Sequence, residues 1–89
     1  MKLIVAIVRD IEADAVLSAL VERRFGVTRI ASTGGFLRRG NTTFLVGIED
    51  EKVDQALDTL RSACSRSNEA ADQRRATLFV LSVARFEQL

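Results

Sequence analysis

A nearly continuous apolar segment at the start of the chain, residues 2 to 9, most strongly constrains its fold. The segment reads KLIVAIVR, which is typical of a central β-strand that is covered on one face and contacted on both. It is too short to span a membrane, which takes roughly 20 apolar residues. It also ends in Arg9 and Asp10 without the small-residue cleavage site of a secretory signal. We therefore expect a soluble protein whose core begins with this strand.

A helix is predicted directly after this strand. Asp10 is suited to cap its first turn, and Gly26 is suited to end it in a left-handed conformation. The apolar residues that recur at helical spacing are Ala13, Leu17, Leu20, Val21 and Phe25, while Asp14, Ser18, Glu22 and Arg23 are expected to face water.

The remaining elements follow from similar patterns. Residues 27–32 and 41–48 have β character and are predicted to pair as a hairpin. After the carboxylates of Glu49, Asp50 and Glu51, which suit a helix N-terminus, a second helix carries one apolar stripe. That stripe consists of Val53, Ala56, Leu57, Leu60, Ala63 and Cys64. Residues 77–83 form a last apolar strand.

The resulting order, βαββαβ, predicts an α+β, ferredoxin-like sandwich in which two helices cover one face of a four-stranded antiparallel sheet. We expect residues 1–89 to form a single domain. The strands are apolar on more than one face, yet no third helix is available for the second face. Another subunit is its natural cover, and a domain of this size gains stability from association.

Composition narrows the function classes. Lys and Arg number 13 against 12 Asp and Glu, so the formal net charge of +1 gives no field for a nucleic-acid polymer. The chain has no His and a single Cys, which removes an imidazole base, the usual zinc site and an internal disulfide. Cys64 is expected to be a core thiol. We therefore expect a cytoplasmic protein that is not an enzyme and holds no metal or cofactor.

The densest unusual chemistry lies in residues 32–43, STGGFLRRGNTT. Paired glycines let backbone N–H groups approach a phosphate or base closely, Phe36 could stack on a nucleobase, and Asn41 offers both a donor and an acceptor. The alternative is a hairpin turn in which the glycines satisfy only backbone geometry, Phe36 fills the core and Arg38 and Arg39 are solvated. Residue types alone do not choose between these interpretations.

Residues 33–45, TGGFLRRGNTTFL, resemble the TTGGFLRxGNTTFL signature of the cyclic di-AMP receptor family, whose fold is PII-like. The first strand, Val53 and Asp54 in the second helix, and residues 76–81 in the last strand are also similar to that family. The resemblance therefore spans nearly the whole chain.

The resemblance implies a homotrimer that binds cyclic di-AMP, or a related adenine nucleotide, between adjacent subunits and breaks no bond. Its output would be a changed contact with a downstream protein that the sequence does not identify. The residues that match the family's ligand site are Thr28, Gly35, Phe36, Leu37, Asn41, Gly47 and Gln88. By this resemblance Phe36 contacts an adenine, Thr28 and Asn41 hydrogen-bond polar groups of the ligand, and the loop amides meet phosphate or base.

The chain departs from the family at three places. Gly26 stands where similar receptors carry an arginine, Leu89 replaces a terminal aromatic residue, and residues 65–75 replace a much longer loop. Structural roles also stay open for three site residues: Thr28 as a strand residue, Gly47 as a mark of a bulge or close packing, and Gln88 as part of a solvated end. A module that keeps the oligomeric scaffold but has lost the ligand is therefore the alternative function.

Overall fold

The computed structural model describes residues 1–33, 40–64 and 76–89. Its elements are strand β1 (Lys2–Arg9), helix α1 (Asp10–Glu22), strand β2 (Val27–Thr33), strand β3 (Asn41–Ile48), the short 3-10 turn η2 (Asp50–Lys52), helix α2 (Val53–Cys64) and strand β4 (Ala76–Ser82). The predicted βαββαβ order is confirmed, with the strand boundaries within about one residue of those expected, while the first helix ends earlier than its predicted stop at Gly26.

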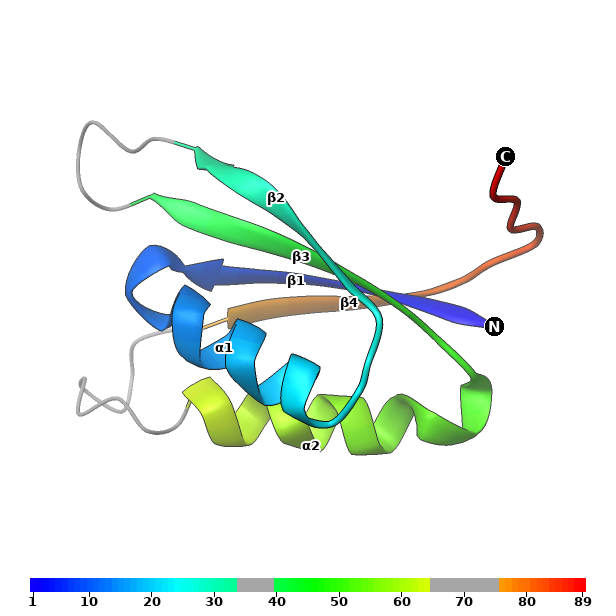
Figure 1. Cartoon of the computed structure of the whole chain (residues 1–89), viewed down its shortest axis with the longest axis horizontal. Helices are drawn as coiled ribbons and strands as arrows, with labels where there is room; N and C mark the ends of the chain where they lie inside the picture. The colour runs from blue at the N-terminus through cyan, green and yellow to red at the C-terminus, as the bar shows by residue number, and fades with distance from the viewer. Residues whose placement is uncertain (34–39, 65–75) are drawn as a thin grey trace.

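The four strands form one sheet in the order β2-β3-β1-β4, and all neighbours are antiparallel. In the central strand, Ile4 lies opposite Val46 on β3 and Val80 on β4. Both helices lie on the same side of the sheet (Figure 1). This is the predicted α+β, ferredoxin-like and PII-like arrangement.

The core fills the space between the helices and the sheet. Strand residues reach it at every second position, as with Ile4, Ala6 and Val8 of β1, because successive side chains point to opposite faces. Phe44 of β3 is the largest fully buried side chain, and its burial contributes roughly 1.5–3 kcal/mol. Cys64 is buried at the end of α2, as expected for a core thiol.

Helix α1 is turned slightly from its predicted orientation. The prediction that Val21 belongs to the apolar stripe is wrong, because its side chain is 56% exposed, while Val16, which was not predicted, is fully buried. At 100° per residue, Val21 lies roughly 80° around the helix from Ala13, at the margin of the buried face. Neither helix in the described part of the chain has the length and apolar character needed to cross a membrane.

The end of α1 corrects a second prediction. The left-handed residue is Arg24, with φ 65°, and not Gly26. The N–H of Phe25 donates to the carbonyl of Leu20 at 3.0 Å, and the N–H of Arg24 donates to that of Val21 at 2.9 Å. These two bonds define a Schellman motif, in which the residue after the left-handed one folds back onto the helix. Phe25 packs against the core, so the turn has to occur at Arg24.

The prediction that Asp10 caps α1 through its side chain is also wrong. The helix begins at Asp10, the preceding Arg9 is the cap residue, and no side chain bonds to the first-turn amides. The Asp10 carboxylate instead accepts a hydrogen bond from Thr42 on β3, at 2.7 Å. Arg9 bonds Glu12 at 3.0 Å and so helps to bury that carboxylate.

Candidate functional site

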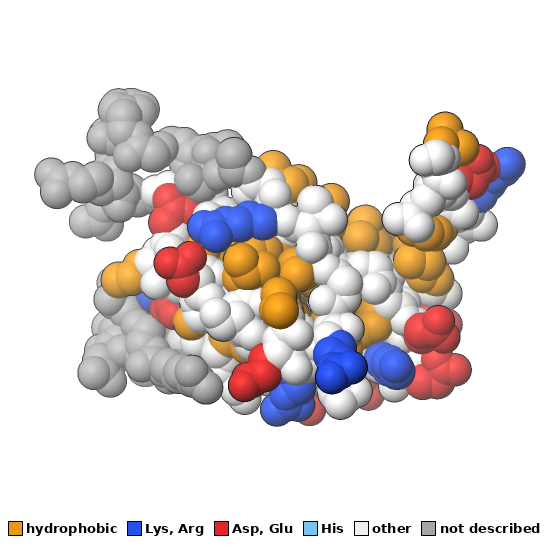
Figure 2. Space-filling view, in the orientation of Figure 1, with side chains coloured by type: hydrophobic (Ala, Val, Ile, Leu, Met, Phe, Trp, Pro, Cys, Tyr) orange, Lys and Arg blue, Asp and Glu red, His pale blue; other side chains and the backbone are white. Residues whose placement is uncertain are grey.

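The face of the sheet that is turned away from the helices, here called the open face, carries apolar and hydroxyl side chains. Three of its large apolar residues are strongly exposed: Ile30 at 45%, Phe79 at 50% and Leu81 at 48%. Figure 2 shows hydrophobic side chains at the margin above β2 and on the C-terminal segment that projects from the fold. By strand alternation and register the strand residues on the open face are Leu3, Val5, Ile7, Arg9, Thr28, Ile30, Asn41, Thr43, Leu45, Gly47, Thr77, Phe79 and Leu81.

Three of the predicted ligand residues lie on strands that form this face. Thr28 of β2 is exposed and lies opposite Leu45 of β3. Gly47 follows Leu45 on the same face of β3, diagonal to Thr28. Asn41 is the exposed first residue of β3 and lies opposite Arg9 of β1. The hydroxyl of Thr28 and the amide of Asn41 are therefore available to a ligand.

Within one chain these residues do not converge on a single point. Asn41 and Gly47 are six residues apart on β3, which at about 3.3 Å per residue separates them by roughly 20 Å. Thr28 is nearer to Gly47 than to Asn41 by the register of the strands. One copy of the chain thus presents two parts of the predicted site, at opposite ends of a strand.

Gly47 has a close neighbour within its own chain. A Cβ atom at this position would lie 2.9 Å from the Cε atom of Met1, so that side chain would have to move. The structure thus gives Gly47 a packing role, one of the alternatives considered above. Beside it lies a hollow of about 380 Å³ lined by Met1, Gly47, Ile48, Glu49, Asp50 and Glu51.

This hollow is acidic. The N-terminal ammonium lies 3.0 Å from the Oδ1 atom of Asp50, and the hydrogen bond between them lowers the pKa of that carboxyl. Asp50 therefore stays ionised beside Glu49 and Glu51 across the physiological range. A phosphate would meet an unfavourable field here, so an anionic ligand is expected to approach Gly47 from the open face.

Among the described strand residues, alternation gives the open face one cation, Arg9 at the end of β1, opposite Asn41. Arg9 is engaged by the buried carboxylate of Glu12 at 3.0 Å, which offsets its charge. Gly26, which precedes β2, stands in open space, since a Cβ atom there would meet nothing within 4 Å. An arginine would therefore fit where similar receptors carry one.

Of the other predicted residues, the structure describes only Gln88. Gln88 is exposed in the segment after β4, which leads away from the sheet (Figure 1). Gly35, Phe36 and Leu37 lie outside the described residues, as does the shortened 65–75 connection. Their roles stay predictions.

Two features of this region were not predicted. Phe79 presents an exposed aromatic ring on the open face, opposite Val5, where the sequence pattern indicated only a strand. Strand β2 also has an irregularity between Ile30 and Thr33, with one more residue than the facing part of β3. Bulges of this kind are common beside functional sites. The alternation of residues 77, 79 and 81 with their neighbours could have located Phe79, but no glycine or proline marks the bulge.

Comparison with known proteins gives two findings. A family model described as "Cyclic-di-AMP receptor" matches residues 1–75, a range that includes Thr28, Asn41 and Gly47. The chain is also similar to a protein of unknown function from Pediococcus pentosaceus, whose crystal structure aligns with a TM-score of 0.76 at 34% sequence identity. That alignment covers 99% of this chain and 96% of the other, so the two share the fold throughout.

Proposed function

This chain belongs to the cyclic-di-AMP receptor family, and from that premise we propose that it binds cyclic di-AMP, or a related adenine nucleotide, in clefts between the subunits of a homotrimer. The bound nucleotide changes contacts with a downstream protein, and no bond is broken. A cytoplasmic location is part of this proposal, as expected for a signalling chain with a single, buried Cys.

The open face is the observation that carries the proposal. It is the uncovered side of the sheet, and Thr28, Asn41 and Gly47 lie on the strands that form it. Its exposed apolar side chains, among them Phe79 and Leu81, favour contact with further copies of the chain. Association through this face would bring the predicted ligand residues next to a subunit boundary.

The spacing of the site residues supports a cleft between subunits. A compact cyclic dinucleotide cannot contact both ends of β3, which lie roughly 20 Å apart. We infer that Thr28 and Gly47 of one copy face Asn41 of the next. In this arrangement the Thr28 hydroxyl and the Asn41 amide bond polar groups of the nucleotide, and Phe36 contacts an adenine.

Calorimetric titration with cyclic di-AMP, ATP, ADP and AMP tests the proposal. We expect cyclic di-AMP, or one of the adenine nucleotides, to bind the wild-type protein. Thr28→Val keeps the strand and the shape of the side chain but removes the hydroxyl, so the dissociation constant should rise about fivefold to tenfold for one lost hydrogen bond. Absence of heat and of a thermal shift with all four nucleotides would refute ligand binding.

Subunit mixing tests the placement of the site. Thr28→Val and Asn41→Ala are each expected to bind weakly when alone. If the two residues come from different copies, mixed oligomers contain clefts in which both wild-type residues meet, and part of the tight binding should return. Mixtures that bind no better than the separate variants would place both residues in the same copy's site.

The alternative function is an interaction module of the same oligomeric fold without a ligand. Two observations favour it: Arg9, the one cation that alternation gives the open face among the described strand residues, is paired with Glu12, and Gly26 stands where similar receptors carry an arginine. Pulldown with the immobilised protein separates the two functions. A module without a ligand recovers the same partners at every nucleotide concentration, whereas the receptor gains or loses partners when cyclic di-AMP is added.

A further inference from the structure

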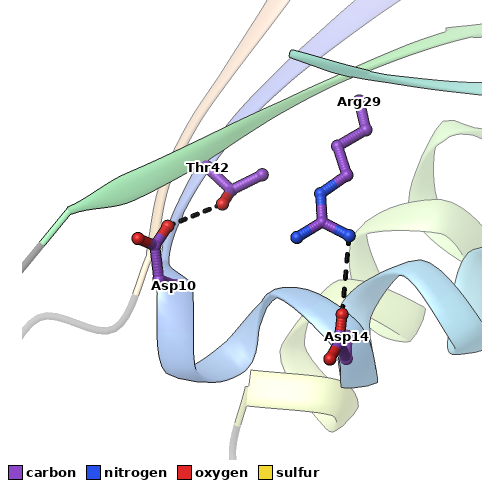
Figure 3. Close-up of polar contacts among 4 residues, drawn as sticks. All are labelled: Asp10, Asp14, Arg29 and Thr42. Atoms are coloured by element: carbon purple, nitrogen blue, oxygen red, sulfur yellow. Dashed lines mark hydrogen bonds and ion pairs between the residues drawn. The ribbon is translucent and has the colours of Figure 1, made fainter. Parts of the chain in front are cut away.

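Asp10, at the start of α1, contacts the residues on both sides of Asn41. Its backbone N–H donates to the carbonyl oxygen of Gly40 at 3.1 Å. Its Oδ1 atom accepts a hydrogen bond from the hydroxyl of Thr42 at 2.7 Å (Figure 3). One residue of the helix thus fixes the chain immediately before and immediately after Asn41.

Because the side chains of β3 alternate between the two faces of the sheet, the contact between Asp10 and Thr42 lies on the helix side and not on the open face. Thr42 points toward the helices and is 1% exposed, while Asn41 is exposed. Neighbouring residues of a strand point to opposite faces, so a hold on Thr42 from the helix side sets the backbone from which the Asn41 side chain projects. The two contacts of Asp10 are thus made with the neighbours of Asn41 in the chain.

The hydrogen bond between Asp10 and Thr42 is of a kind that can hold the backbone beside Asn41 in place. It joins a carboxylate to a buried hydroxyl at a short distance, and hydrogen bonds to charged groups are roughly twice as strong as neutral ones. The carboxylate is not committed to capping its own helix, because no side-chain cap bond is present at the start of α1.

A second acid on the same helix supplies a contrast. Asp14, one turn further along, faces Arg29 of β2 at 3.4 Å (Figure 3). Its side chain is 96% exposed, so water and salt screen this pair. Of the two acid contacts between α1 and the described residues of the hairpin, that of Asp10 is the one with a buried partner.

We propose that Asp10 is a positioning residue for the nucleotide site: through Gly40 and Thr42 it holds Asn41 in the orientation that the ligand requires. This inference rests on the proposed function and adds to it a residue that does not touch the ligand. The inference gives the hydroxyl of Thr42 a role in ligand binding, whereas the volume of its side chain contributes only to the core.

Two substitutions of Thr42 distinguish positioning from plain stability. Thr42→Val keeps the volume and β-branching but removes the donor, so the dissociation constant for cyclic di-AMP should rise about fivefold to tenfold, and the unfolding midpoint should fall because a buried hydrogen bond is lost. Thr42→Ser keeps the donor but removes a buried methyl, so the midpoint should fall while the affinity stays near the wild-type value. If Thr42 is only structural, affinity follows stability in both variants, and the proposal is overturned.

Asp10→Ala and the double variant Asp10→Ala/Thr42→Val complete the test. Asp10→Ala should weaken binding about as much as Thr42→Val, and the double variant should weaken it little further, because both changes remove the same bond. Losses that multiply would show that the two residues act independently, against the proposal.

Two control variants address other buried hydroxyls and surface acids. Thr59 is also buried, and its hydroxyl donates to the Gln55 carbonyl within α2 at 2.9 Å, so Thr59→Val should leave the affinity unchanged. Asp14→Asn should do the same. Weakening of the size seen with Thr42→Val in either control would overturn the special role of Asp10.

Amide NMR of the protein without ligand tests the positioning role of Asp10 separately from nucleotide binding. Thr42→Val and Asp10→Ala should shift the Asn41 side-chain resonances and speed exchange of the neighbouring amides, and Thr42→Ser should restore both. Unchanged Asn41 signals would overturn the positioning role even if the wild-type protein binds nucleotide. Wild-type protein that binds no nucleotide would instead refute the proposed function, and this inference would fall with it.

Discussion

Gly26 is a residue at which a substitution, by arginine, is expected to improve ligand binding. A Cβ atom there meets nothing within 4 Å, and the backbone is not in the left-handed region, so a larger residue can be accepted without strain. Because Gly26 precedes Thr28 by two positions, a side chain there is expected on the same side of the strand. Arginine at this position would bring a positive charge toward the open face.

Gly26→Arg is therefore expected to tighten cyclic di-AMP binding by about tenfold, the effect of one charge-assisted hydrogen bond to phosphate. Calorimetry at two salt concentrations measures it, and the gain should shrink at high salt. Gly26→Ala controls for the reduced freedom of the unfolded chain. Equal affinities for the Ala and Arg variants would mean that no phosphate lies within reach of this position.

Single residues also indicate how far the site could be predicted from sequence. The burial of Cys64 was predicted from its place on the apolar stripe of the second helix, and the structure agrees. Thr28 and Asn41 were named only through the family resemblance. The role of Asp10 was not predicted, because its partner Thr42 is 32 positions away and a local pattern offers only the helix cap. Long-range polar contacts of this kind depend on the assembled sheet.

At the scale of elements, the C-terminus of α1 gives a prediction about stability. Arg24 has φ 65°, which costs a residue with a Cβ atom roughly 1 kcal/mol compared with glycine. Arg24→Gly should therefore raise the free energy of unfolding by up to about 1 kcal/mol, which denaturant titration can measure. Gly26→Ala, outside the left-handed region, should not destabilise. A less stable Arg24→Gly variant would contradict the helix end described here.

Elements with a strong apolar pattern were predicted best. The nearly continuous apolar run of β1 and the single apolar stripe of α2 predicted a central strand and a helix that packs on the sheet, and both are confirmed. The end of α1 and the bulge in β2 were not predicted, for different reasons. The left-handed residue was predicted at Gly26 because it is a glycine. It is Arg24 instead, since the packing of Phe25 decides where the helix ends. The bulge carries no turn residue at all.

At the scale of the whole molecule, the open face predicts self-association. Leu81 is 48% exposed there, and a carboxylate at this position would be buried in any interface formed through the face. Leu81→Glu is therefore expected to reduce the mass of the particle to that of a monomer in light scattering. Ile11→Glu is the matched control, because Ile11 is 76% exposed on α1, on the helix side of the molecule. A wild-type monomer, or an unchanged mass in Leu81→Glu, would contradict the proposed assembly.

Native mass spectrometry of the wild-type protein during titration with cyclic di-AMP measures the assembly and the ligand in one spectrum. Binding in clefts between subunits predicts trimers that carry up to three nucleotides, with none on monomers. Thr42→Val should give trimers with fewer nucleotides at the same concentration. Monomers that carry one nucleotide each, or trimers that remain empty at saturating concentration, would contradict a receptor whose ligand binds between its subunits.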